Sequence, residues 1–170
     1  MAEKESFNKK IYDLSKQFNI PYALVHRIIS SYISNCKDLL ASGYIVQIFG
    51  MITIVPSETV SDEVHTLAYQ CRGIAKEQGH PYVTTLTIVT EYLNSIRRDL
   101  FEGRPSGIKG FIHLKPTLHS DGTVTLYGST AVALKTYLKS IRGYGFSARA
   151  FTFKLLRNQV AGQLSAEVFA

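Results

Sequence analysis

The spacing of apolar residues changes from helical to strand-like along the chain, and it does so twice. In residues 24–40 apolar side chains recur every three or four positions, which predicts an amphipathic helix that begins at Pro21 and ends at Gly43. Residues 86–100 repeat this spacing and end at Gly103. We therefore expect two long helices, each with one apolar face packed against a core.

A shorter amphipathic stretch precedes each predicted helix, and strand-like runs follow it. The preceding stretches are residues 7–18 and 64–74. The following runs, residues 44–55 and 106–114, each surround a glycine and predict a β-hairpin. The pattern predicts an α+β protein in which a unit of helix, helix and β-hairpin occurs twice.

The two units are copies of one sequence. Residues 20–56 align with residues 80–116 without a gap, and a repeat of this length usually corresponds to one supersecondary unit used twice. Ten aligned positions are identical: Pro21/Pro81, Tyr22/Tyr82, Ile28/Ile88, Tyr32/Tyr92, Leu40/Leu100, Gly43/Gly103, Ile48/Ile108, Gly50/Gly110, Ile52/Ile112 and Pro56/Pro116.

The second copy continues beyond the repeat. The alternating run 123–127 predicts a third strand, and Ser129 is a candidate cap for a helix that carries Val132, Leu134, Tyr137, Leu138 and Ile141 and stops at Gly143. Residues 148–160 suit a strand or a helix, and the alternation favours a strand. The chain is accordingly divided into residues 1–58, 59–145 and a C-terminal extension, 146–170.

The composition is ordinary for a globular protein, with 45% apolar and 19% charged residues in a chain of 170. No stretch resembles a membrane span, and the charged N-terminus leads into no apolar segment of a secretory signal, so we expect an intracellular protein. Cys36 and Cys71 occupy non-equivalent repeat positions without metal-ligand spacing. We expect both to be reduced core residues.

The net charge of +6 comes mainly from the C-terminal part. Residues 1–121 hold 13 basic and 12 acidic residues, whereas residues 122–170 hold six basic residues and one acidic residue. This asymmetry suits DNA or another acidic partner, although six charges in so long a segment are also typical of ordinary solvated side chains. The candidate contacts are Lys135, Lys139, Arg142, Arg149, Lys154 and Arg157.

The repeated unit resembles the HU/IHF family of histone-like proteins. The residues that carry the resemblance are a long second helix ending in Leu40-x-x-Gly43 or Leu100-x-x-Gly103, followed by a hairpin with a glycine in its turn. The resemblance covers roughly residues 5–56 and 65–141. Since family members are dimers of one such unit, it implies a pseudo-dimer in one chain, with an extra strand and helix in the second unit.

The DNA-binding arms of that family are missing from the sequence. DNA-bending members extend two long basic β-arms that wrap the minor groove. At that position this chain has residues 115–122, with one lysine, and the acidic residues 56–63. Phosphate contacts supply most of the affinity of non-specific DNA binders, so we expect much of that affinity to be absent.

Armless members of this group are associated with crAss-like phages, in which such proteins look like virion parts around the portal and tail. The resemblance therefore implies a non-enzymatic structural protein, a phage virion ring or head-tail connector component that binds other copies of itself and neighbouring virion proteins. The alternative is a nucleoid-type architectural DNA-binding protein, which would locate to the cytoplasm or nucleoid instead of the virion. Candidate subunit-interface anchors, which could equally complete the core, are Phe146, Phe151, Phe153 and Phe169.

No pattern in the sequence indicates catalysis or a cofactor. The five histidines are scattered, and the closest pair, His113 and His119, has no third ligand nearby. The glycines of residues 103–110 are interrupted by Pro105 and follow a helix, which is not the context of a phosphate-binding loop. We expect neither a metal nor a catalytic site.

Overall fold

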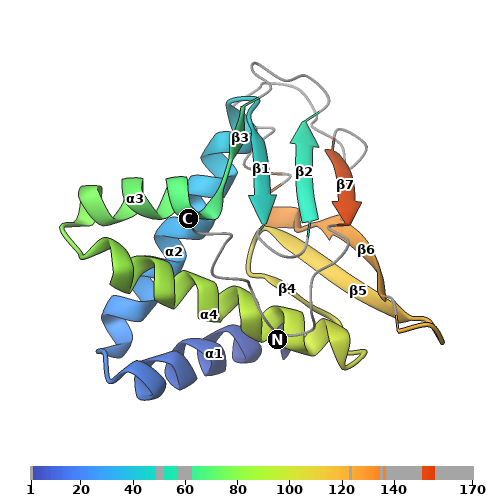
Figure 1. The fold of residues 1–170 in the computed structure, drawn as a ribbon, viewed down its shortest axis with the longest axis horizontal. Helices are drawn as coiled ribbons and strands as arrows, with labels where there is room; N and C mark the ends of the chain where they lie inside the picture. The colour runs from blue at the N-terminus through green and yellow to red at the C-terminus, as the bar shows by residue number, and fades with distance from the viewer. Residues whose placement is uncertain are drawn as a thin grey trace.

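The protein has an α+β fold in which four long helices gather on one side and two small sheets on the other (Figure 1). The structure, a computed structural model, describes these parts of the chain: residues 2–48, 52–56, 63–122, 124–134, 136 and 151–155.

The order of elements repeats after sixty residues. The first copy contains α1 (Ala2–Phe18), α2 (Tyr22–Ala41), β1 (Ile45–Ile48) and β2 (Ile52–Pro56). The second contains α3 (Leu67–Gln78), α4 (Tyr82–Phe101), β4 (Ser106–Ile108) and β5 (Ile112–Leu118), followed by β6 (Val124–Thr130). The predicted unit of helix, helix and β-hairpin is therefore present twice.

The long helices end in the same way in both copies. Gly43 and Gly103 have φ angles of 88° and 82°, a left-handed conformation that a side chain would strain. In each copy the residue after this glycine donates its backbone N–H to the carbonyl five residues back, at 2.9 Å. The helix stops predicted from these glycines are confirmed.

The two copies share one core. Helix α1 packs on both α2 and α4, and α3 packs on the same two helices, so each first helix contacts the second helix of the other copy. Phe7 on α1, for example, meets the ring of Tyr92 on α4 edge-to-face at 6.1 Å between centroids. Equivalent positions are buried in both copies: Ile28/Ile88, Ile29/Val89, Tyr32/Tyr92, Ile33/Leu93, Cys36/Ile96, Leu40/Leu100, Ile48/Ile108 and Ile54/Leu114.

Two sheets follow from the two hairpins. The second copy forms the three-stranded sheet β4-β5-β6 that the sequence predicts. The first copy belongs to a four-stranded sheet in the order β3-β1-β2-β7, where β3 is Val64–His65 and β7 is Phe151–Leu155. The preference for a strand near residue 150 is confirmed for these five residues, and the sheet that receives the strand is that of the first copy.

Two local predictions are wrong. Val64 does not begin the third helix, because residues 64–65 pair in parallel with β1. The helix starts at Leu67. Before it, the side chain of Thr66 accepts a hydrogen bond from the backbone N–H of Tyr69 at 3.3 Å. Thr66 thus ends the strand and caps the helix.

Ser129 is not a helix cap. It lies in β6 opposite His113, and the strand continues to Thr130, so helical residues begin only at Val132. An N-cap stands directly before the first helical residue, and that position is occupied by Ala131. The rest of that predicted helix, from residue 137 to Gly143, lies outside the described residues.

Candidate interaction surfaces

Most of the predicted contact residues lie outside the described part of the chain. These are Lys135, Lys139, Arg142, Arg149 and Arg157 of the basic set, and Phe146 and Phe169 of the aromatic set. Three predicted residues fall in β7, where Phe151, Phe153 and Lys154 lie opposite Pro56, Ile54 and Thr53 of β2.

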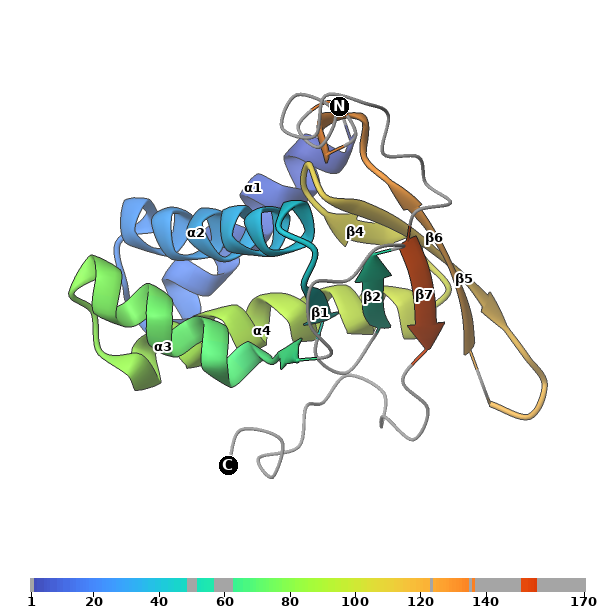
Figure 2. The same ribbon diagram turned by 90° about the horizontal axis from the view of Figure 1, so that it is seen from above.

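Strand β7 occupies the same place in its sheet as β6 does in the other sheet. Pro56 pairs with Phe151 and Ile54 with Phe153, while the equivalent Pro116 and Leu114 pair with Leu126 and Gly128. Both pairings are antiparallel. Equivalent residues of β2 and β5 have partners at equivalent places in β7 and β6. In Figures 1 and 2, β7 lies beside β2 as β6 lies beside β5. A remote C-terminal strand therefore completes the first copy, whereas a local hairpin completes the second.

The β5–β6 hairpin projects from the body, as both views show (Figure 2). Beyond Leu114, β4 has ended, so among the described residues β5 is paired only with β6 there, and Pro116 is accommodated without an N–H on its other side. Leu118, beside the turn, is 52% exposed, and Tyr127, in the middle of β6, is 65% exposed. Lys115 is the hairpin's single lysine or arginine. The register places these two side chains on opposite faces of the hairpin, because Tyr127 is opposite Lys115 and Leu118 is opposite Val124. The sequence indicated a short turn here and missed both exposed side chains, for which the alternation of 123–127 was the available signal.

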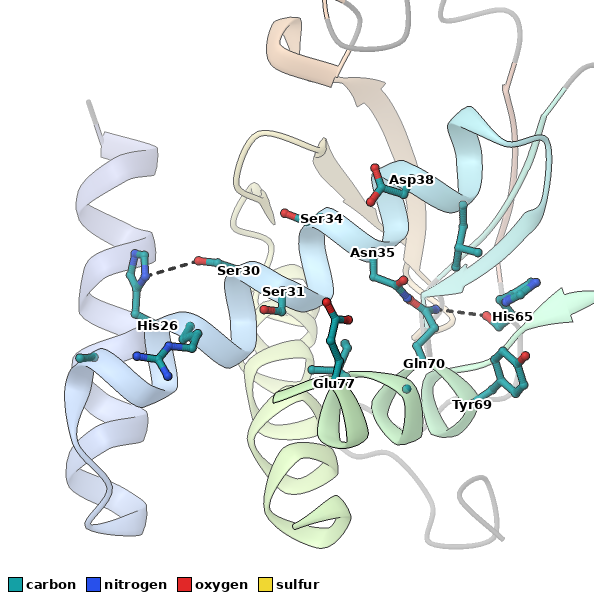
Figure 3. Close-up of a pocket in the computed structure, with 15 residues that line it drawn as sticks. His26, Ser30, Ser31, Ser34, Asn35, Asp38, His65, Tyr69, Gln70 and Glu77 are labelled. Carbon is teal, nitrogen blue, oxygen red and sulfur yellow. Dashed lines mark hydrogen bonds between the residues drawn. The ribbon is translucent and has the colours of Figure 1, made fainter. Parts of the chain in front are cut away.

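A groove of about 690 Å³ lies between α2 and α3. At its floor the amide oxygen of Gln70 accepts from Asn35 Nδ2 at 3.0 Å and from Cys36 Sγ at 3.3 Å, and its nitrogen donates to the carbonyl of His65 at 3.2 Å. Figure 3 shows Asn35 and Gln70 pointing toward each other from the two helices. Gln70 is only 2% exposed, so its amide is a buried bridge between the two copies.

A second groove, of about 550 Å³, lies between α1 and α4 at equivalent positions. Here the carboxylate of Asp99 accepts from Lys10 Nζ at 2.8 Å, from Arg104 at 2.8 Å and from Ser106 at 3.1 Å. Burial alone would raise the pKa of Asp99, but the hydrogen bonds from Lys10 and Arg104 outweigh it and hold the pKa below its usual value. Lys10 is the repeat equivalent of Gln70. The same interface is therefore ionic in one half and a neutral amide in the other.

The five residues that α3 contributes to the first groove occupy the repeat positions of the five that α1 contributes to the second. They are Tyr69/Lys9, Gln70/Lys10, Gly73/Asp13, Ile74/Leu14 and Glu77/Gln17. The sequence analysis missed both grooves. The available signal was a polar residue, Gln70 or Lys10, at a core-facing position of an otherwise apolar helix face.

A smaller hollow of about 410 Å³ lies where α1 meets the β4–β5 hairpin. Its lining includes Lys10, Lys109, Lys115 and His113 and no carboxylate. Lys109 Nζ lies 4.7 Å from the centroid of the Phe7 ring, a cation–π contact. Lys10 is paired with Asp99, and Lys109 and Lys115 are the other two lysines of this lining.

Both cysteines lie in the buried core. Cys36 and Cys71 are buried free thiols, as the sequence predicted, and burial raises the pKa of each to about 12. Within the described ranges, no group of three or more His, Cys, Asp or Glu side chains could hold a metal ion.

None of the described helices combines the length and apolarity needed to cross a membrane. The chain matches no protein-family model, and none of the curated protein sequences matches it.

Proposed function

We propose that this protein is a non-enzymatic structural assembly protein built on a tandem, armless HU/IHF-like fold, most concretely a ring or head-tail connector component of a phage virion. Two copies of one unit with a shared core support a pseudo-dimer made within one chain. The protein would then be located in the virion, after assembly in the host cytoplasm, and its partners would be further copies and neighbouring virion proteins.

The observation that carries the proposal is the chemistry of the β5–β6 hairpin. At the place where DNA-bending relatives of the HU/IHF type would carry basic arms, this hairpin has one lysine and two exposed apolar side chains, Leu118 and Tyr127. Phosphate contacts need cations, whereas exposed aromatic and aliphatic side chains on a projecting element are typical of protein contacts.

The proposal is tested by the mass of the protein in solution. Light scattering over a range of protein concentrations should give oligomers, and Leu118→Ser together with Tyr127→Ser should shift them toward the monomer. Val83→Ser is the matched control, because Val83 is 70% exposed on α4, away from the hairpin, and the change should leave the oligomers intact. A strictly monomeric wild-type chain at all concentrations would contradict the proposal.

The second candidate is a nucleoid-type architectural DNA-binding protein. The basic hollow around Lys109 and Lys115 favours it, together with the excess of basic residues after residue 121. Binding through several cations weakens steeply between low and physiological salt, and Lys109→Ala with Lys115→Ala should reduce that salt dependence. Absence of binding to duplex DNA at low salt would exclude this candidate.

A further inference from the structure

In both sheets a third strand lies beside the hairpin of the repeat, but the two third strands come from different parts of the chain. In the first sheet this position, beside β2, is filled by β7, which follows β2 by more than ninety residues. The equivalent position in the second sheet is filled by β6, which follows β5 after a turn of five residues, 119–123. One position is thus filled locally and the other by a distant segment.

The contacts of β7 allow it to leave its sheet as a unit. Among the described elements it packs mainly on β2, with a smaller contact to β6, and its five residues pair one-to-one with Ile52–Pro56. Fourteen residues, 137–150, separate Thr136 from Phe151. The seven of them that follow the predicted helix stop at Gly143, residues 144–150, span about 23 Å when fully extended at roughly 3.3 Å per residue, which sets the distance over which β7 can be donated to a neighbouring copy.

The position beside β2 cannot stay empty without a penalty. An unpaired β2 would present a row of free N–H and C=O groups in the apolar run Ile52–Val55, which is a template for pairing with another strand. A strand supplied by a second copy would make the same backbone pairs as a strand supplied by the same copy. Exchange of an identical element is a common route to oligomers.

We propose that the edge of β2 is a strand-acceptor site, and that in the assembled protein its occupant is β7 from a second copy of this chain. The proposal rests on the assembly function above and adds a second contact between subunits, which acts together with that of the β5–β6 hairpin. With one donor strand and one acceptor edge in the described part of each chain, two copies can exchange strands reciprocally. Donation from each copy to the next gives instead a head-to-tail contact that closes into a ring when the rotation between neighbours permits, and this is the arrangement proposed for the assembly.

Disulfide trapping distinguishes exchange from pairing within one chain. Thr53 and Lys154 are opposite each other in the β2–β7 register. Chains carrying only Thr53→Cys are mixed with chains carrying only Lys154→Cys, unfolded, refolded together and oxidised. We expect a shift from monomer to covalent dimer on a non-reducing gel. The wild-type chain controls for Cys36 and Cys71, which are buried.

The second copy supplies a matched control. His113 and Ser129 are at the equivalent positions of the β5–β6 hairpin, so mixed His113→Cys and Ser129→Cys chains should give no covalent dimer. The double variant Thr53→Cys/Lys154→Cys should give a ladder of covalent multimers. The proposal is overturned if that double variant closes only within single chains, or if neither arrangement cross-links.

Failure of strand exchange remains distinct from failure of assembly. If light scattering shows oligomers while every Thr53–Lys154 disulfide is intrachain, subunits associate through another surface and only the strand-exchange proposal fails. If the wild-type chain is a monomer at all concentrations, the assembly function itself fails.

Discussion

The two copies of the repeat agree in fold and differ in how they are joined. Between α1 and α4 the interface is held by the ion pair of Lys10 and Asp99, whereas between α3 and α2 it is held by the buried amide of Gln70 with Asn35. In a homodimer these two interfaces would have the same residues. Duplication within one chain removes that constraint, and each half has acquired its own polar contact.

The buried positions of the two copies keep their apolar character: of the eight equivalent pairs, four are identical and four exchange one apolar residue for another. Ile28 and Ile88 are both fully buried, and so are the pairs Tyr32/Tyr92 and Leu40/Leu100. A close-packed core penalises any change in volume, whereas a polar interface pair can be replaced by another pair of matched partners. The two copies therefore share their core packing and differ in their helix–helix interfaces and in the origin of their third strand.

The largest expected effect comes from breaking the shared core at equivalent positions. Ile28→Ala and Ile88→Ala should each lower the free energy of unfolding by about 2–5 kcal/mol, because each leaves a cavity at a fully buried site. Since both copies contribute to one core, each variant should still unfold in a single transition, measured by circular dichroism and calorimetry. Two transitions, only one of them shifted, would show that the copies fold independently.

A smaller effect is expected at the amide bridge. Gln70→Ala removes the acceptor for Asn35 and Cys36 and the donor to the His65 carbonyl, which should lower the free energy of unfolding by about 1–3 kcal/mol. Gln70→Glu keeps the size but not the donor, so it should lose stability as well. Chemical denaturation at neutral pH measures the free energy of unfolding of both variants. If that of Gln70→Ala equals the wild-type value, the bridge adds no stability.

The pattern of the sequence predicts most of the helices and the existence of both hairpins. Apolar spacing and the glycine stops at Gly43 and Gly103 depend on local geometry, and these features hold in the structure. The errors at Val64 and Ser129 arise where pairing with a strand outside the local window of residues competes with a local helix signal. Pairing partners far apart in the chain leave no mark in local spacing.

The candidate surfaces were less predictable than the fold. The alternation around Phe153 favours a strand, but nothing in it specifies β2 as the partner. The grooves depend on contacts between residues far apart in the chain on different helices, such as Lys10 and Asp99, which are 89 residues apart. The projection of the β5–β6 hairpin depends on where β4 ends, which apolar spacing does not reveal.

The smallest effect is expected at the ionic interface, and pH separates it from the amide bridge. Asp99→Asn removes the charge that Lys10 and Arg104 bind, and should lower the free energy of unfolding by about 1 kcal/mol at pH 7, since the site is partly open to solvent. The fold lowers the pKa of Asp99, so its contribution is fully present above the pKa of the unfolded chain and is lost as the pH falls through the folded value.

The difference between wild type and Asp99→Asn should therefore shrink below about pH 4, the usual range of an aspartate, and the variant should match the wild type in stronger acid. The difference between wild type and Gln70→Ala should not change over the same range through titration of the bridge, because Gln70 and Asn35 do not ionise. Urea denaturation from pH 7 down to pH 3 measures both differences. If the Asp99→Asn difference were constant with pH, the contribution of Asp99 would come from its shape and neutral hydrogen bonds, and the two interfaces would be chemically alike after all.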